Sequence, residues 1–269
     1  MDNIKNLSDV FGYVKETDAY YKVYAKATYY PNFTRVFVPD RPYDKLIPFM
    51  EPVNKIKTIN GKPFSVVEES FDRSLRRTKK RLTDYVLCNQ FELFATFTFD
   101  GLKIDRYDID KCKNSMSGWF KNQQKRKGKF EYTVVPELHK DGALHFHALL
   151  KNYPGRLKES TSSNTGKLLK QKGRQLFDIP SYRLGFTNVK KIDDSSEDQT
   201  KVGFYLLKYI KKDMPLFPGK KKYWVSNGLI LPKTEDNPGE WYKKFQPIRE
   251  YKIEFGVIYD FPITAKGSE

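Results

Sequence analysis

The chain has 269 residues, of which 39% are hydrophobic and 15% aromatic, enough to bury a substantial core. No apolar run approaches the roughly 18 residues that a membrane helix needs, and the two cysteines, Cys88 and Cys112, exclude a disulfide framework. Lys and Arg outnumber Asp and Glu by 49 to 33, and the net charge of +16 favours nucleic acid as a partner ahead of an anionic membrane. The first residues form no basic and then apolar leader, so we expect a soluble, unprocessed protein of the reducing cytoplasm with no membrane partner.

The N-terminal part of the chain predicts strands followed by a basic helix. Within residues 1–63, the alternating runs YKVYAKATYY and TRVFVPD indicate two strands joined by a turn. Residues 64–87 have apolar side chains at helical spacing on an otherwise basic surface. That surface is either solvated or in contact with DNA phosphates, and the DNA-contact candidates on it are Arg76, Arg77 and Lys80.

The middle of the chain alternates predicted strands and helices. Strands are predicted at 91–100, 130–138, 143–150, 185–192 and 220–232, and helices from about 107 to 124 and about 196 to 212. The second helix opens with a capping box formed by Ser196 and Gln199. Residues 151–180 are polar and basic and predict a mobile loop, and 233–269 predict a C-terminal extension with one further apolar stretch.

Two of the three histidines, His145 and His147, stand one residue apart in the predicted strand 143–150. Side chains alternate across a strand, so both imidazoles point to one face while their neighbours point into the core. This arrangement suits a metal site, but two imidazoles alone leave Mg²⁺ or Mn²⁺ short of oxygen ligands. The alternative is an ordinary pair of half-exposed histidines.

Glu137 supplies the missing oxygen ligand if the hairpin has the right turn. The sequence HKDGA suits a three-residue loop, 140–142, with Gly142 in the left-handed conformation. That register places Glu137 directly opposite His145, and directly opposed residues share a face. A two-residue Asp-Gly loop would shift the register and send Glu137 to the face of Phe146.

Two tyrosines on the helix predicted through about 212 are candidate nucleophiles. Tyr205 and Tyr209 are four residues apart and share a helix face, with Lys208 and Lys212 beside them. A phenol with its ordinary pKa near 10 is a poor nucleophile. Nearby ammonium groups favour the phenolate, and a divalent cation polarises a phosphodiester for attack. The alternative is an amphipathic helix whose tyrosines lie at the edge of the core.

Three motifs stand in order: FATFTF (94–99), ELHKDGALHFHALL (137–150) and YLLKYIKK (205–212). In this order they resemble HUH endonucleases of the rolling-circle replication initiator (Rep) type, and most of all the phage and plasmid initiators that include the filamentous-phage gene II group. The resemblance covers about residues 64–232, and Glu137 matches the family's separate acidic ligand.

The resemblance implies an α+β fold, with a central antiparallel sheet of about five strands and flanking helices. The nuclease domain would cover 64–232, between an N-terminal β-rich extension at 1–63 and a C-terminal extension at 233–269. The site residues implied are Glu137, His145 and His147 as ligands of Mg²⁺ or Mn²⁺ and Tyr205, Tyr209, Lys208 and Lys212 as catalytic residues. We further expect Thr96, Thr98, Arg76, Arg77 and Lys80 to contact DNA.

The activity implied is site-specific nicking of one DNA strand at an origin. The protein would stay on the 5′ phosphate, the free 3′ hydroxyl would prime replication, and a second transfer would rejoin the strands. The partners would be single-stranded or hairpin origin DNA and a host helicase, since 233–269 contain no phosphate-binding helicase loop. The alternatives are a single-tyrosine HUH transposase-like nuclease and a non-catalytic basic DNA-binding protein. Both Tyr205 and Tyr209 fit the family's Tyr-x-x-Lys spacing, so which one attacks first stays open.

Overall fold

The computed structural model describes residues 20–46, 64–210 and 222–263. The chain divides into two compact units: a central unit, Lys62–Leu231, and a split unit formed by Met1–Gly61 together with Pro232–Glu269. None of the helices in the described residues combines the length and the apolar composition of a membrane-spanning segment.

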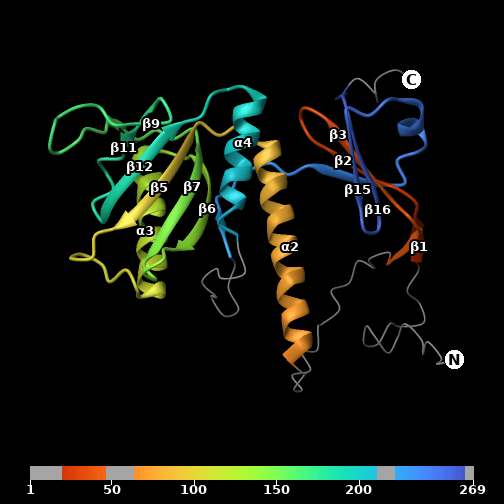
Figure 1. Ribbon diagram of the computed structural model, residues 1–269, viewed down its shortest axis with the longest axis horizontal. Helices are drawn as coiled ribbons and strands as arrows, with labels where there is room; N and C mark the ends of the chain where they lie inside the picture. The colour runs from red at the N-terminus through yellow and green to blue at the C-terminus, as the bar shows by residue number, and fades with distance from the viewer. Residues whose placement is uncertain (1–19, 47–63, 211–221, 264–269) are drawn as a thin grey trace. The chain divides into compact units, whose positions relative to one another are not determined.

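A seven-stranded antiparallel sheet lies at the centre of the central unit, in the order β13-β6-β7-β5-β12-β11-β8. In that order its strands are Trp224–Val225, Glu131–Leu138, Leu144–Lys151, Leu93–Phe99, Gly185–Lys191, Phe177–Asp178 and Lys158–Glu159. Figure 1 labels β6, β7, β5, β12 and β11 of this sheet. The predicted α+β class with a central antiparallel sheet is confirmed. The sheet exceeds about five strands because the two-residue strands β8, β11 and β13 extend its edges.

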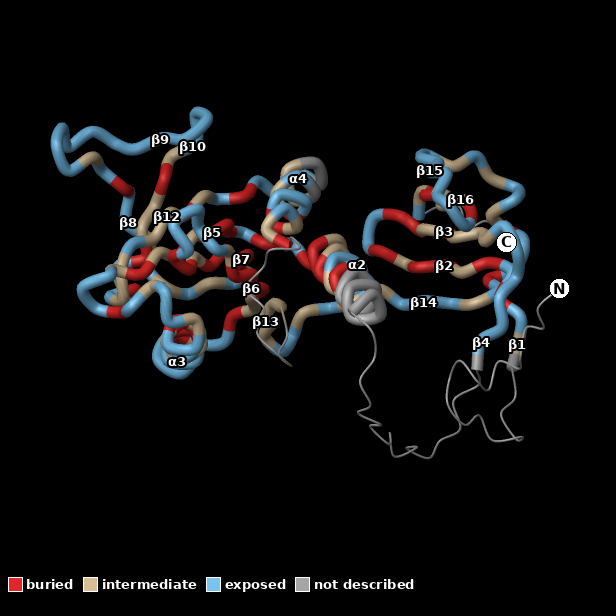
Figure 2. Tube along the Cα trace, turned by 60° about the horizontal axis from the view of Figure 1, so that its bottom comes forward, coloured by how far each residue is buried: buried red, intermediate tan, exposed pale blue. Residues whose placement is uncertain are grey.

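Helices cover both faces of this sheet. Because side chains alternate along each strand, both faces of the sheet contribute apolar residues to a core. The helices are α2 (Phe64–Cys88), α3 (Ile109–Lys127) and α4 (Ser196–Leu207). On one face, Phe97 and Phe146 pack with Trp119 of α3. On the other, which we call the α4 face, Leu149 packs with residues of α2 and α4 such as Leu206. The strands between these two layers are largely buried (Figure 2).

The β6–β7 hairpin has the predicted register. Glu137 lies opposite His145, and the backbone N–H of His139 donates to the carbonyl of Ala143. Gly142 has a φ of 85°, which a residue without a Cβ adopts without strain. The three-residue loop predicted from HKDGA is therefore confirmed.

The helix α4 begins and ends differently from the prediction. Its N-cap is Ser195 and not Ser196, because the Ser195 hydroxyl accepts the backbone N–H of Asp198. The helix ends at Leu207 and not near 212, and Lys208 and Tyr209 form a turn directly after it. Tyr209 is thus held just beyond the helix that carries Tyr205.

Residues 151–180 are more ordered than the predicted loop. They contain β8 and β11 of the central sheet and a separate hairpin of β9 (Lys170–Gln171) and β10 (Arg174–Gln175). Ser160, which directly follows β8, is buried; its backbone N–H donates to the carbonyl of Leu176, and its carbonyl accepts from the N–H of Leu169. Two-residue strands are too short to show a periodicity, so the sequence gives no sign of them.

The split unit joins sequence-distant strands in one antiparallel sheet, in the order β14-β2-β3-β16-β15. In that order these are Lys233–Asp236, Lys26–Tyr29, Thr34–Pro39, Gly256–Phe261 and Arg249–Ile253; beside them are the pair β1 (Tyr20–Val23) and β4 (Tyr43–Leu46) and the short helix η1 (Trp241–Lys244). From the sequence we expect separate N- and C-terminal extensions. In the structure the two ends are joined, because β2 pairs with β14 and β3 with β16. The strand turn predicted between 30 and 34 is present, closed by Tyr30 and Phe33.

Candidate active site

Both imidazoles lie on the α4 face, and a threonine of β5 holds each of them. Thr96 Oγ1 is 3.1 Å from Nδ1 of His147, and Thr98 Oγ1 is 3.2 Å from Nδ1 of His145. His147 is buried and His145 half-buried. Contacts at Nδ1 orient a ring and leave Nε2 as its ligand-binding nitrogen.

Glu137 reaches this pair from β6. Its backbone lies opposite His145, but its Oε2 is 2.7 Å from Nε2 of His147. Such a diagonal contact between neighbouring strands is within reach of a long side chain. Glu137, His145 and His147 therefore lie on one face as the hairpin register predicts, with the carboxylate on His147 instead of His145.

The surroundings of His145 favour a neutral imidazole. Burial lowers the pKa of His145, and His139 and His147 act in the same direction against the opposing charge of Glu137. The ring of His139, from the hairpin turn, stacks with its centroid 5.2 Å from that of His145. Neutral imidazole is the form that binds a metal.

The residues fit a hard divalent cation in their chemistry. Among the described residues, no group of three or more His, Cys, Asp or Glu side chains is already arranged as a metal centre. Two imidazoles oriented through Nδ1 and one carboxylate nevertheless form a mixed nitrogen and oxygen donor set on adjacent strands of a rigid sheet. This donor set suits Mg²⁺ or Mn²⁺, and the binding of either ion stays a prediction.

The end of α4 brings both candidate tyrosines to the histidines. Leu206 and Ile210 are buried in the core of the α4 face and anchor this segment. The ring of Tyr209 stacks on His147, with centroids 3.6 Å apart and planes at 11°. Tyr205 meets Tyr209 edge to face, with centroids 5.4 Å apart.

The two phenols differ in environment. Tyr205 is 40% exposed, and Nζ of Lys208 lies 5.1 Å from its ring centroid. Tyr209 is half-buried, and its pKa is raised by burial, by its hydrogen bond with Tyr205 and by the charge of Glu137. Lys212, the other predicted lysine, lies outside the described residues.

The predicted DNA contacts fall into two groups. The hydroxyls of Thr96 and Thr98 contact the imidazoles, so the structure gives them a positioning role that the sequence analysis missed. Arg76, Arg77 and Lys80 are exposed on α2, and Lys80 pairs with Asp84 at 2.9 Å. Contact of either group with DNA stays a prediction.

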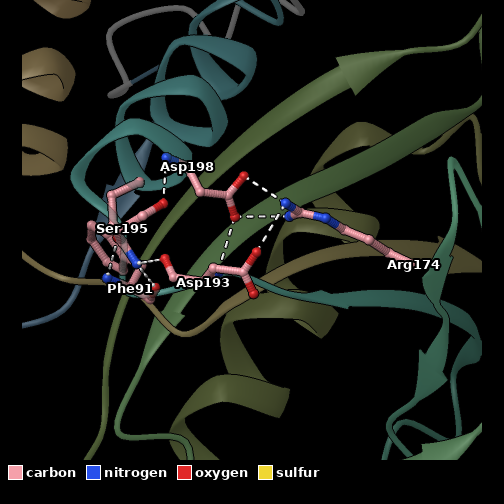
Figure 3. Close-up of polar contacts among 6 residues, drawn as sticks. Phe91, Arg174, Asp193, Ser195 and Asp198 are labelled. Atoms are coloured by element: carbon pink, nitrogen blue, oxygen red, sulfur yellow. Dashed lines mark hydrogen bonds and ion pairs between the residues drawn. The ribbon is translucent and has the colours of Figure 1, made fainter.

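Polar contacts at the start of α4 fix the tyrosine-bearing helix (Figure 3). Arg174, from the β9–β10 hairpin, donates to both carboxylate oxygens of Asp198 at 2.8 Å and to Asp193 at 3.1 Å. The side chain of Gln199 donates to the carbonyl of Phe91 and accepts its N–H, at 2.7 and 2.9 Å. Sequence reasoning missed Arg174, because a contact between charges 24 residues apart leaves no local pattern.

Gly203 allows α4 to lie close to α2. A Cβ on Gly203 would lie 1.8 Å from a methyl carbon of Val86. Any larger residue would push the helix and its tyrosine away from α2. The signal in the sequence is a glycine inside a helical pattern, which usually has a packing reason.

Comparison with known proteins matches one segment of the chain to a family. Residues 92–214 match the family model for replication-associated proteins of the ORF2 and phage gene II type. The match covers less than half of the chain, but it includes β5, the β6–β7 hairpin and α4 with both tyrosines. The resemblance to gene II-type replication proteins is thus confirmed for this segment, while membership of the HUH superfamily is not directly shown. Searches of curated proteins and of solved structures found no significant match.

Proposed function

We propose that this chain is a rolling-circle replication initiator, a metal-dependent nickase that cuts one DNA strand at an origin and later rejoins strands. The family match over 92–214 supports a role in replication. The observation that carries the chemistry is the stacking of Tyr209 on His147, whose Nε2 contacts Glu137. A candidate nucleophile thus packs on the sheet face that carries a donor set for a divalent cation.

In this proposal the phenol oxygen of Tyr205 or Tyr209 attacks the phosphorus of the scissile phosphodiester. An O–P bond forms to the 5′ phosphate and the P–O3′ bond breaks, while the phenol proton passes through solvent to the departing 3′ oxygen. The products are a 5′-phosphotyrosine and a 3′ hydroxyl that primes synthesis. Because the bond energy is retained in the phosphotyrosine, a later attack by a 3′ hydroxyl rejoins the strands and restores the tyrosine.

Each side chain has a defined part in this reaction. Mg²⁺ or Mn²⁺ supplies Lewis-acid polarisation of the phosphate when bound, and its ligands would be Glu137, His145 and His147. Lys208, next to the ring of Tyr205, stabilises negative charge on the phenolate or the phosphate. Lys212 is proposed for the same role from its spacing to Tyr209.

The proposed substrate is single-stranded or hairpin origin DNA, in keeping with the net charge of +16. A host helicase would unwind the duplex ahead of the 3′ end, in the cell that carries the phage or plasmid. The DNA-contact roles of Arg76, Arg77 and Lys80 belong to this proposal.

Formation of a covalent protein–DNA adduct tests the proposal. The full chain is incubated with Mn²⁺ and single-stranded or hairpin DNA from the replicon that encodes it, and the products are separated under denaturing conditions. We expect a denaturation-resistant band that the double variant Tyr205→Phe/Tyr209→Phe abolishes. The matched control is Tyr251→Phe, at an exposed tyrosine of the split unit, which should leave the band unchanged. A salt-sensitive shift without a resistant band would instead identify a non-catalytic DNA-binding protein.

A further inference from the structure

An exposed phenylalanine lies in the same cross-strand row as two of the candidate ligands, Glu137 and His145. Phe186 of β12 is 68% exposed, although it belongs to a strand inside the central sheet. Phe186 lies directly opposite Thr98 of β5. Thr98 in turn lies opposite His145 of β7, and His145 lies opposite Glu137 of β6. Directly opposed residues share a face, so Phe186 lies on the α4 face.

The distance from Phe186 to the candidate site is short. Neighbouring strands are about 4.8 Å apart, so two strand spacings place Phe186 roughly 10 Å from His145. A few nucleotides of a DNA strand whose phosphate lay at the histidines would pass over this part of the sheet. The ring is therefore within reach of bases next to the cleaved bond.

Packing explains why this ring is open while the part of the face under α4 is covered. Toward the other end of β5, Phe94 packs with Leu206 of α4 in the core of the α4 face, and His147 is buried beneath Tyr209. Phe186 has no place in either core cluster of the central unit.

The backbone holds the ring in place. A Cβ on Gly185 would lie 2.1 Å from the carbonyl oxygen of Thr98, so glycine is needed for β12 to approach β5 at this point. The register then fixes Phe186 opposite Thr98, through six further pairs along β12 and β5. The ring thus projects from a rigid strand and not from a loop.

Charge points to the occupant of this face. The central unit contains 34 Lys and Arg against 19 Asp and Glu, so it attracts phosphate strongly. Lys190 shares the strand and the face of Phe186, since it lies opposite Phe94. Aromatic rings on a basic surface are the usual arrangement for binding single-stranded nucleic acid, whose bases stack on the rings while its phosphates meet the cations.

We propose that Phe186 is a base-stacking residue for the single strand that enters the candidate site, with Lys190 contacting the backbone of that strand. The inference rests on the proposed function for the identity of the strand, and it adds the surface that holds the bases beside the cut. Stacking tolerates any base, so this subsite contributes affinity and positioning rather than sequence choice.

Binding to two probes without divalent cation tests the proposal separately from cleavage. The probes are an oligothymidylate of about 12 nucleotides and an abasic oligomer of the same length and charge. We expect Phe186→Ala to weaken binding to oligothymidylate by about 5- to 100-fold, and to leave binding to the abasic oligomer unchanged. Phe186→Trp should retain the preference for bases. The matched control is Phe255→Ala, at a phenylalanine of the split unit that is 67% exposed and should not alter either affinity.

Photocrosslinking to iododeoxyuridine in the same oligonucleotide gives a second readout. We expect the crosslinked peptide to contain Phe186. Equal losses on both probes, or unchanged binding together with a change in oligomeric state, would overturn the proposal and assign the ring to folding or to a protein contact. If the base preference depends on Phe186 but no covalent adduct ever forms, the stacking subsite stands and the nicking function fails.

Discussion

The central unit and the split unit carry charge very differently. The central unit has a net charge of +15, whereas the split unit contains 15 Lys and Arg against 14 Asp and Glu, a net charge of +1. Almost the whole surplus of the chain therefore lies in the unit with the histidines and tyrosines. Attraction of phosphate and the candidate chemistry therefore belong to the same unit, and the nearly neutral split unit contributes little to either.

Ion pairs also have different roles in the two units. In the split unit, Arg35 holds Asp260 through two hydrogen bonds of 2.7 and 2.9 Å, and Asp260 is fully buried. In the central unit, Arg174 holds Asp198 at the surface, at the start of the tyrosine-bearing helix. Buried charge supports the fold in the first case, and exposed charge supports the geometry of a site in the second.

The largest expected effect separates chemistry from binding within the central unit. His147→Ala removes the ring that contacts both Glu137 and Tyr209. Adduct formation should fall by at least about 100-fold, since the loss of even an outer partner of a metal ligand costs 10- to 100-fold. Binding of single-stranded DNA without divalent cation, measured by fluorescence anisotropy, should stay within about twofold. A variant that loses binding and adduct formation in parallel would show that His147 serves the fold.

The next effect belongs to the split unit. Arg35→Ala leaves the buried carboxylate of Asp260 without its bidentate partner, which should destabilise the split unit by about 3 kcal/mol. Urea unfolding followed by the fluorescence of Trp241, the buried tryptophan of that unit, measures the change. For this purpose the other tryptophans, Trp119 and Trp224, are replaced by Phe. A loss below about 0.5 kcal/mol would mean that Arg249, 3.9 Å from Asp260, takes over the pairing.

A smaller effect, on the salt dependence of DNA binding, tests which unit's positive charges contact phosphate. If Arg76 and Arg77 each neutralise one phosphate, the double alanine variant should lower the slope of log affinity against log salt by about 1.4 on single-stranded DNA. The control is Lys22→Ala/Lys252→Ala, which removes two exposed charges from the split unit. Equal changes in slope for the two double variants would remove the distinction between the units.

The smallest expected effect concerns the contact that fixes α4. Hydrogen bonds from Arg174 lower the pKa of Asp198. A lowered pKa in the folded state gives stability that is complete above the unfolded value near 3.9 and lost as the pH falls through the folded value. Arg174→Ala should therefore cost under about 1 kcal/mol near neutral pH, and the difference should shrink as the pH falls below about 4. Urea unfolding over a pH series measures it, and a difference that persists in strong acid would contradict this origin.

The sequence predicts the parts of the site that depend on local pattern. The HKDGA turn determines the register of β6 and β7, which brings Glu137 and the histidines to one face. Helical spacing predicts α2 and α3 to within a few residues. These features depend on residues within a few positions of one another, where turn chemistry and periodicity act.

Long-range features could not be predicted in this way. The pairing of β3 with β16 joins residues more than 200 positions apart, and a single sequence has no signal for such a contact. The end of α4 at Leu207 could not be predicted either, because the helical spacing of buried apolar residues continues from Leu206 to Ile210. The Thr96 and Thr98 contacts require the order of β5 and β7 in the sheet, which no local pattern gives.

Mass spectrometry of the protein after cleavage shows directly whether a tyrosine of the central unit attacks the DNA. Trypsin cuts after Lys208, so the two tyrosines fall on separate peptides, VGFYLLK and YIK. We expect one or both peptides to gain the mass of a 5′-linked nucleotide, and only when a divalent cation is present. Cleaved DNA with neither peptide modified, or with the nucleotide on a residue of the split unit, would contradict it.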